Sequence, residues 1–271
     1  QELLNLPNHL AVVSVFMHKI VTNLKLRSEC LDVVKKTLAL LADLAGGYSS
    51  GKLLFELDLV HFMLGHHGAP EFPFLEVTAN SRLRTSFYST LCKLLFSSEH
   101  TLKFKDFMRP FTERFVHLRE QMGSEHAFLR AEVSATLIGL LRDIRGVVSA
   151  CSSRRTYTYF FEWIYPDFTA VLQRAAIVYH AVPAVSTPLL KLYAELVYNK
   201  GQRLTFECWA TDAHNEPVAW KSLRRDPSDG VPDVSHSLAT ATGVSTVGLV
   251  GVGTARAVAF GVSRVLRLLR R

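Results

Sequence analysis

Apolar side chains recur at intervals of three and four residues along most of the first 206 positions, and this periodicity limits the possible folds more than any other feature. Two such runs are Leu38, Leu41, Leu44 and Ala45, and Phe87, Leu91, Leu94 and Leu95. An α-helix places residues three and four apart on one face. The alternating stretch at 203–207 is too short to build a sheet. The sequence therefore predicts an all-α fold.

The predicted helices form about four pairs, separated by polar, glycine-containing or proline-containing breaks. The pairs are 9–26 with 29–45, 52–66 with 82–96, 102–122 with 125–150, and 156–180 with 186–204. They begin at positions 9, 52, 102 and 156, which are 43, 50 and 54 residues apart. This spacing is typical of a HEAT-repeat-type α-solenoid, in which each helix pair buries its apolar face by stacking on the next pair.

Four residues inside these helices are unusual for a helix interior. Pro110 and Pro166 are each expected to kink a helix or to mark its first turn. Gly139 and Gly146 each cost about 1 kcal/mol relative to alanine in a helix. The close approach of a neighbouring helix would explain both glycines without any ligand.

The positive charge of the chain is concentrated at its C-terminal end. The formal net charge is +7, and residues 240–271 supply five arginines and no acidic residue: Arg256, Arg264, Arg267, Arg270 and Arg271. The preceding residues carry only +2, which is poor support for a nucleic-acid-binding surface. Arg256 and Arg264 interrupt the apolar stretch at 244–269, so that this stretch contains no uncharged span of 18 residues, and no membrane insertion is expected.

The four cysteines, Cys30, Cys92, Cys151 and Cys208, lie far apart, and none belongs to a CxxC pair. This spacing predicts neither a disulfide framework nor a zinc site, and the first three are expected to be reduced and buried in helices. Residues 1–10 lack the features of a signal peptide. Because no initiator methionine is present, the chain is expected to be a fragment.

Three motifs imitate functional sites. GGYSSGK at 46–52 has the spacing of a phosphate loop, but Leu53 stands where magnesium coordination needs a hydroxyl, and a turn that closes a helix is the better interpretation. His61, His66 and His67 are expected to be surface histidines near a helix end, because their spacing does not place metal ligands on one helical face. GLVGVGTAR at 248–256 lacks the acidic residue and crossover unit of a dinucleotide site. No catalytic, cofactor-binding or metal-binding residues are therefore predicted.

An aromatic run and a group of charged residues remain as candidates for binding. The aromatic residues are Tyr157, Tyr159, Phe160, Phe161, Trp163, Tyr165 and Phe168, and helical spacing places most of them in the core rather than in a base-stacking platform. Arg142, Asp143 and Arg145 interrupt an otherwise apolar helix. They are interpreted mainly as a ladder of Asp–Arg pairs between repeats on a concave face, and alternatively as charges presented to a protein partner.

Six phrases resemble those of the exportins, which belong to the importin-beta superfamily of nuclear transport receptors. The phrases are LADLAGGYSS (41–50), HFMLGHHGAPEFPFL (61–75), RLRTSFYSTLCKLLF (82–96), LIGLLRDIRG (137–146), FFEWIYPDFTAVLQRA (160–175) and TPLLKLYAELVYNKGQRLTF (187–206). They follow the family order and cover roughly residues 30–206. The resemblance implies a HEAT-repeat receptor that binds Ran in its GTP form together with protein cargo.

The same resemblance implies passage through the nuclear pore in contact with nucleoporins, with shuttling between nucleus and cytoplasm. It implies no enzymatic step and no cofactor, since GTP would enter only through bound Ran. Family members are several times longer, and the repeats that provide the principal Ran contact are expected to lie outside this chain. The alternative hypothesis is a helical-repeat scaffold that binds protein without Ran-dependent transport.

The resemblance stops near residue 206. Residues 1–206 are therefore predicted to form the solenoid segment, residues 207–239 a loop-like linker, and residues 240–271 an irregular tail rich in Gly, Ala, Val and Arg. A retained intron or a shifted reading frame is one hypothesis for this tail.

Overall fold

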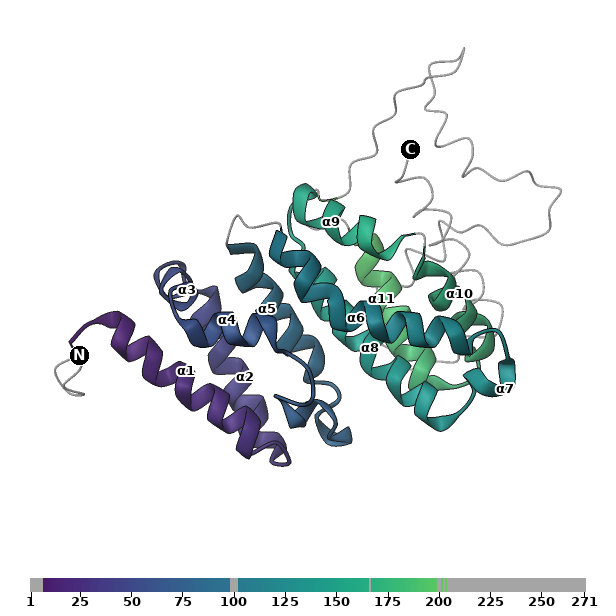
Figure 1. Ribbon diagram of the computed structural model, residues 1–271, viewed down its shortest axis with the longest axis horizontal. Helices are drawn as coiled ribbons and strands as arrows, with labels where there is room; N and C mark the ends of the chain where they lie inside the picture. Colours follow the sequence, from purple (N-terminus) through teal and green to yellow (C-terminus); the bar gives the residue numbers. More distant parts are fainter. Residues whose placement is uncertain (1–6, 98–101, 166, 199–200, 202, 204–271) are drawn as a thin grey trace, which may run out of the picture. The chain divides into compact units, whose positions relative to one another are not determined.

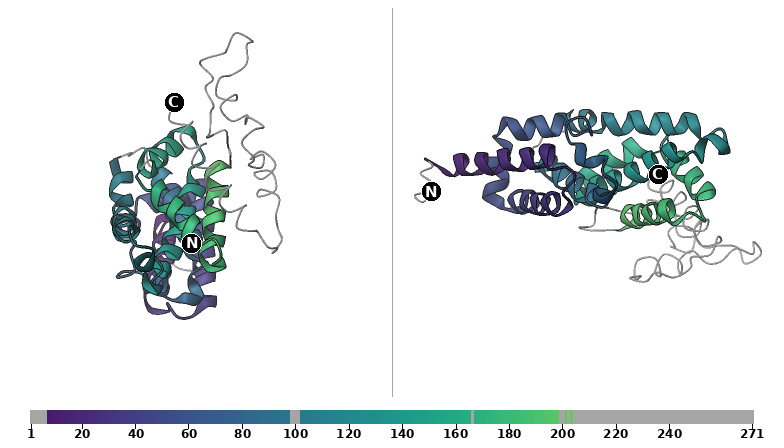
Figure 2. Two further views of the ribbon diagram at one scale, coloured as in Figure 1. Left: turned by 90° about the vertical axis from the view of Figure 1, so that its right-hand side faces the viewer. Right: turned by 90° about the horizontal axis from the view of Figure 1, so that it is seen from below.

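The computed structural model describes residues 7–97, 102–165, 167–198, 201 and 203 of the chain. Its elements are α1 (His9–Leu26), α2 (Leu31–Gly46), α3 (Tyr48–Phe55), α4 (Asp58–Gly65), η2 (Pro73–Leu75), η3 (Thr78–Asn80), α5 (Arg84–Ser97), α6 (Leu102–Gln121), α7 (Glu125–Phe128), α8 (Ala131–Ala150), α9 (Arg154–Ile164), α10 (Thr169–Val178) and α11 (Pro183–Val197). The described residues form only helices and the turns that connect them, as the views in Figures 1 and 2 show. The predicted all-α helical-repeat fold is confirmed. The predicted linker at 207–239 and tail at 240–271 lie outside the described residues.

The described residues fall into two compact units. The first contains the described residues of Gln1–His117 and of Ala135–Cys151, and the second those of Leu118–Ser134 and of the chain after Ser152. The first unit thus holds α1 to α5 with most of α6 and α8. The second holds α7, α9, α10 and α11.

Side chains at the helix ends explain where several helices begin. The Asn8 side chain accepts a hydrogen bond of 2.8 Å from the backbone N–H of Ala11 and so caps α1. Ser153 and Thr156 form a reciprocal capping box at the start of α9. Each cap satisfies backbone donors that have no partner within the helix.

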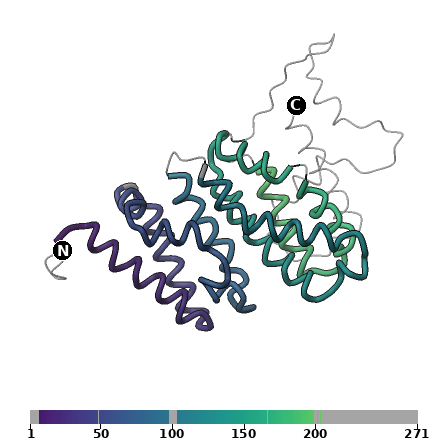
Figure 3. The backbone as a smooth tube through the Cα atoms, viewed as in Figure 1, coloured from purple at the N-terminus to yellow at the C-terminus, as the bar shows by residue number. Residues whose placement is uncertain are grey.

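In the first unit, α1 and α2 pack against each other, and α2 also packs against α3 and α5 (Figure 1). The chain reverses direction in the short connection between α1 and α2, as the tube in Figure 3 shows. The buried side chains between these helices include Met17, Leu24, Leu38, Leu41 and Leu91. They are the periodic apolar residues of the sequence, which explains why this part of the chain packs as successive helices.

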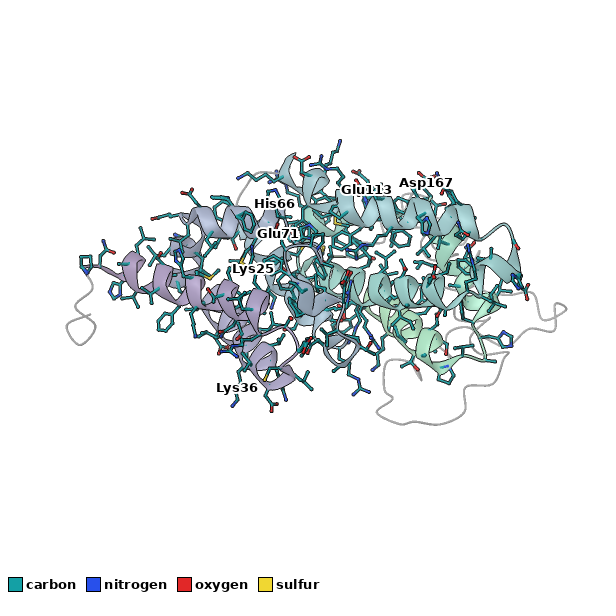
Figure 4. All side chains as sticks on the ribbon, turned by 60° about the horizontal axis from the view of Figure 1, so that its bottom comes forward. Lys25, Lys36, His66, Glu71, Glu113 and Asp167 are labelled. Carbon is teal, nitrogen blue, oxygen red and sulfur yellow. The ribbon has the colours of Figure 1, made fainter. Side chains whose placement is uncertain are left out.

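A surface ion pair connects α1 to the segment that precedes η2. Lys25 Nζ lies 2.6 Å from Glu71 Oε2 and 4.8 Å from the ring centroid of Phe62. Figure 4 labels Lys25 and Glu71, which lie next to each other. Both side chains are about one-third exposed (34% and 38%), so solvent screens the pair and its contribution to stability is small.

Three helices predicted as continuous are in fact broken. The predicted helix 52–66 is divided into α3 and α4, 125–150 into α7 and α8, and 156–180 into α9 and α10. At the third break, Tyr165 has an extended backbone (φ −107°, ψ 139°). The residue before a proline is disfavoured in the helical conformation, which accounts for the end of α9 one residue before Tyr165. Pro166 itself lies outside the described residues.

Pro110 is the ninth residue of α6, so it does not mark the first turn. Pro183 is the first residue of α11, where a missing N–H costs nothing, and Pro188 lies inside the same helix. The predicted start of α11 at residue 186 is three residues late.

The two glycines of α8 lie where α5 approaches closely. A Cβ atom on Gly146 would be 2.5 Å from the backbone oxygen of Thr85 and 3.0 Å from the backbone nitrogen of Ser89. A Cβ on Gly139 would be 3.3 Å from the guanidinium carbon of Arg84. The prediction that a neighbouring helix explains both glycines is confirmed.

Tyrosine hydroxyls connect elements of the second unit. Tyr157 on α9 donates a hydrogen bond of 2.7 Å to the backbone oxygen of Leu196 on α11. Tyr179, just after α10, donates to the backbone oxygen of Phe128 in α7. Beyond α11, the buried guanidinium of Arg203 donates to the backbone oxygens of Glu195 and Tyr198. Helices α10 and α11 also pack directly against each other.

Across the described part of the chain, no helix is both long enough and apolar enough to span a bilayer.

Candidate functional site

A buried cluster of three charged residues joins three helices of the first unit. Asp143 of α8 accepts hydrogen bonds from Arg84 Nε (2.7 Å to Oδ1), from Arg84 Nη2 (2.5 Å to Oδ2) and from Arg114 Nη1 (2.9 Å to Oδ2). Arg84 begins α5, and Arg114 lies in α6. The Arg84 Nη1 group also donates to the backbone oxygen of Leu75 in η2. We call Arg84, Arg114 and Asp143 the ion triad.

The members of the ion triad differ in their contact with solvent. The Asp143 side chain is fully buried, that of Arg84 is 10% exposed, and that of Arg114 is 27% exposed. Burial raises the pKa of the Asp143 carboxyl above its ordinary value, and the two arginines oppose this effect. Burial also disfavours the charged form of Arg84, but Asp143 outweighs it and raises the pKa of Arg84. The bidentate contact from Arg84 is the geometry expected of a carboxylate paired with a guanidinium.

The sequence contains a signal for this buried arginine. Phe87, Tyr88 and Leu91 lie three, four and seven positions after Arg84 and are all buried, so Arg84 occupies the apolar face of α5. A charged residue on an apolar helical face needs a partner of opposite charge. Sequence reasoning did not assign Arg84 or Arg114, because the partner Asp143 is 59 positions away from Arg84.

The three charged residues singled out in the sequence lie in different surroundings. Asp143 makes ion pairs between helices, as a ladder requires, but its partners are Arg84 and Arg114 rather than Arg142 or Arg145. Because its side chain is fully buried, Asp143 offers no surface to a partner protein. Arg142 and Arg145 are half-buried, and a role for them in partner binding remains a prediction.

The three histidines predicted to lie at the surface do not share one environment. His66 is exposed and its Nδ1 lies 3.3 Å from the backbone oxygen of Phe62, while His61 contacts the ring of Phe55. His67 is only 1% exposed, so the prediction of a surface position is wrong for this residue. Within the described residues, no group of histidine, cysteine and acidic side chains could hold a metal ion.

His67 is enclosed by aromatic rings and is neutral. Its Nε2 lies 2.9 Å from the backbone oxygen of Phe107, which can only accept, so Nε2 carries the proton. Its Nδ1 is buried without a hydrogen-bond partner, and the rings of Tyr88, Phe107 and Phe111 surround it. Burial, opposed by the hydrogen bond to Phe107, lowers the pKa of His67 to about 4.

We expect His67 to make the fold less stable as the pH falls. The unfolded chain binds a proton at this residue near pH 6.5, whereas the folded chain does so only near pH 4, so stability is lost between these values. Between pH 7 and pH 5 the free energy of unfolding should fall by about 2 kcal/mol on account of His67 alone. Urea unfolding at both pH values measures this change, and His67→Phe is the matched control. A pH dependence that is unchanged in the variant would contradict the assignment.

The segment that imitates a phosphate loop is helical. Gly46 ends α2, and Ser50, Gly51 and Lys52 lie inside α3. The hydroxyl of Ser50 donates to the backbone oxygen of Leu44 at 2.6 Å. The interpretation of the glycines as the close of a helix is confirmed for Gly46 and Gly47, which end α2, and not for Gly51.

The prediction that most of the aromatic run at 157–168 lies in the core is confirmed only in part. Tyr157, Phe160 and Phe168 are buried, and Trp163 is half-buried between Phe160 and Phe168, with ring centroids 5.9 and 5.1 Å away. The remaining members are half-buried: Tyr159, Phe161 and Tyr165.

Where the structure describes them, the cysteines form no disulfide. Cys92 and Cys151 are buried as predicted, and burial, together with the neighbouring Cys151, raises the pKa of Cys92. Cys30 is exposed, so the prediction of burial is wrong for this residue. It lies at the N-cap of α2, outside the helix and its apolar face. Cys208 lies outside the described residues.

Comparison with known proteins gives a consistent result. Residues 1–83 match the family model described as "Exportin-7-like, TPR domain". The chain is 40% identical to Exportin-7-B of Xenopus laevis over 213 residues. This aligned region covers 76% of this chain and 20% of that protein. It is 41% identical over 213 residues to Ran-binding protein 17 of Mus musculus, with 76% of this chain and 19% of that protein aligned. It is 36% identical over 200 residues to Exportin-7 of Dictyostelium discoideum, with 74% of this chain and 20% of that protein aligned.

The chain therefore spans about one-fifth of the length of these relatives. The resemblance drawn from the six phrases is confirmed, and the family model extends it upstream of residue 30. The family model describes its repeats as TPR, where the helix spacing predicted the HEAT type; both are repeats of paired helices. No solved structure matches the chain.

Proposed function

We propose that this chain, which contains an exportin-7-like region, is part of a nuclear export receptor that binds Ran in its GTP form together with protein cargo. The observation that carries the proposal is the similarity, at 40% and 41% identity over 213 residues, to proteins named exportin-7 and Ran-binding protein 17. These names denote transport receptors rather than enzymes, so the proposal contains no catalytic step. GTP enters only through bound Ran.

The helical fold supports a role in protein binding. Repeated helix pairs present long surfaces on which many contacts add up to one binding interface. Such a receptor would contact nucleoporins and would move between the nucleus and the cytoplasm. Because the chain spans about one-fifth of its relatives, its own share of these contacts is expected to be weaker than that of a complete receptor.

The proposal is tested by measuring the binding of the 271-residue chain to purified Ran. Ran loaded with a non-hydrolysable GTP analogue is compared with Ran loaded with GDP, both by capture on immobilised chain and by titration. The expected result is binding at least tenfold tighter to the GTP form. Binding that is indifferent to the nucleotide would contradict the Ran-dependent proposal. Indifferent binding would favour a helical-repeat scaffold that binds protein without Ran-dependent transport.

A further inference from the structure

The exposed side of the seam between α5 and α8 carries basic residues that take no part in the ion triad. Two hydrogen bonds fix this seam. Thr85 Oγ1 donates to the backbone oxygen of Arg142 at 3.1 Å, and Ser149 Oγ donates to Ser89 Oγ at 3.0 Å. The glycine at 146 lets the two helices approach closely between these bonds. The backbone positions from which side chains project on the solvent side of the seam are therefore fixed relative to one another.

Their exposure and their helical positions assign four basic residues to this side, and we call them the basic strip: Arg82, Lys93, Arg142 and Arg145. Arg142 and Arg145 are three positions apart, so they share one face of α8. Lys93 shares a face of α5 with Ser86, seven positions earlier, and Arg82 comes just before that helix. Arg82 and Lys93 are exposed, whereas Arg142 and Arg145 are half-buried.

The fold provides no acidic partner for the basic strip within the described residues. None of its four members forms an ion pair there. Asp143, next to Arg142 in the sequence, is buried and accepts from Arg84 and Arg114. The other residues that line the seam beside the basic strip carry uncharged hydroxyl groups: Thr85, Ser86, Ser89 and Ser149.

Electrostatic interactions at Arg142 agree with an excess of positive charge. Partial burial and the nearby charges of Arg82 and Arg84 lower the pKa of Arg142, and only Asp143 opposes them. The negative charge of Glu76 raises the pKa of Arg84, which is not a member of the basic strip. An anion bound at the strip would reduce the repulsion between Arg82, Arg84 and Arg142.

We propose that the basic strip binds an extended acidic segment, rich in Asp and Glu, of a protein partner. The inference rests on the proposed function, because it names the chemistry of a partner for this receptor region. Ser86, which follows Arg82 in the sequence, and Lys93 lie roughly 10 Å apart along α5 at about 1.5 Å per residue, so the charges of Arg82 and Lys93 are spread over at least this length. One phosphate group is too small to contact charges spread over such a length. An extended peptide, at about 3.3 Å per residue, covers it with three or four residues.

The test uses the full chain and a fluorescein-labelled peptide of ten glutamates as the probe, with a ten-serine peptide for comparison. The arginines of the tail, which could also attract the probe, are replaced by glutamine in the starting background: Arg256, Arg264, Arg267, Arg270 and Arg271. In this background, Arg142→Glu/Arg145→Glu is expected to weaken binding of the glutamate peptide at least tenfold. The ten-serine peptide should bind neither form.

The matched control is Lys19→Glu/Lys105→Glu, which makes the same change in net charge at exposed positions of α1 and α6. It should change the affinity less than twofold. Equal losses in both variants, or no loss in the strip variant, would overturn the inference. Displacement of the peptide by inorganic phosphate as efficiently as by unlabelled peptide would also overturn it, because that result indicates a phosphate site.

A second variant guards against misfolding of the first. Ser86→Glu adds a negative charge at an exposed position of the strip without removing a packed side chain, and it should weaken peptide binding about threefold or more. Circular dichroism melts confirm that each variant is folded. If the strip variants leave peptide binding unchanged while Ran binding still depends on GTP, the inference fails and the proposed function stands. If peptide binding is lost as expected but Ran binding is indifferent to nucleotide, only the proposed function fails.

Discussion

Replacement of Asp143 by alanine is expected to lower the free energy of unfolding by about 3–5 kcal/mol. The carboxylate is fully buried and receives three hydrogen bonds from Arg84 and Arg114, at 2.5–2.9 Å. Its removal leaves the guanidinium of Arg84 charged and largely buried without a counter-ion. A buried charge that loses its partner is far more costly than a lost surface pair. Urea unfolding at pH 7, followed by far-ultraviolet circular dichroism, measures the change.

The neighbouring residue provides the control for this variant. Arg142→Ala removes a half-buried charge that forms no ion pair within the described residues, and it should cost less than about 1 kcal/mol. Asp143→Asn keeps the size of the side chain but removes its charge, so it should be nearly as destabilising as the alanine variant. Equal stability of Asp143→Ala and Arg142→Ala would be incompatible with a structural role for the ion triad.

Replacement of Gly146 by alanine should also destabilise the fold strongly, by about 3 kcal/mol. Helix propensity alone predicts the opposite sign, since alanine is favoured over glycine by about 1 kcal/mol in a helix interior. The new Cβ would lie 2.5 Å from the backbone oxygen of Thr85 and 3.0 Å from the backbone nitrogen of Ser89. Backbone atoms of α5 cannot move aside as a flexible side chain can, so α5 and α8 must separate.

Gly46→Ala is the matched control for the steric argument. Gly46 is the last residue of α2, and a Cβ at this position meets no atom within 4 Å. This variant is expected to be neutral or up to about 1 kcal/mol more stable. The same urea titration compares both variants with the unmodified chain. A stabilised Gly146→Ala would mean that α5 and α8 are not in close contact at this position.

The helical architecture could be predicted from the sequence because it follows from local periodicity. The helix 9–26 was predicted with the bounds of α1, and 102–122 with those of α6 to within one residue. Gly139 and Gly146 could also be explained in advance, because a glycine inside a helix has few physical uses other than close packing. The break between α7 and α8 was missed, since neither proline nor glycine marks it, and the break between α9 and α10 was missed although Pro166 stands in the sequence there.

The ion triad could not be predicted from the sequence in the same way. Its contacts join residues 59 and 29 positions apart, and local periodicity carries no information on which helices meet. Asp143 was singled out, but the arginines beside it in the sequence are not its partners. The exposure of single residues was equally difficult: His67 follows an exposed histidine yet is buried under α6, and Cys30 precedes a helix rather than lying on its buried face.

The most direct test of the account is the coupling energy between Arg84 and Asp143. The account assigns Asp143 to the core that joins α5, α6 and α8, and leaves Arg142 and Arg145 free for binding. A double-mutant cycle with Arg84→Met, Asp143→Ala and the double variant isolates the interaction of the pair. The predicted result is a coupling energy of about 2–3 kcal/mol, with the double variant more stable than the sum of the single effects requires. A coupling energy near zero would contradict the account.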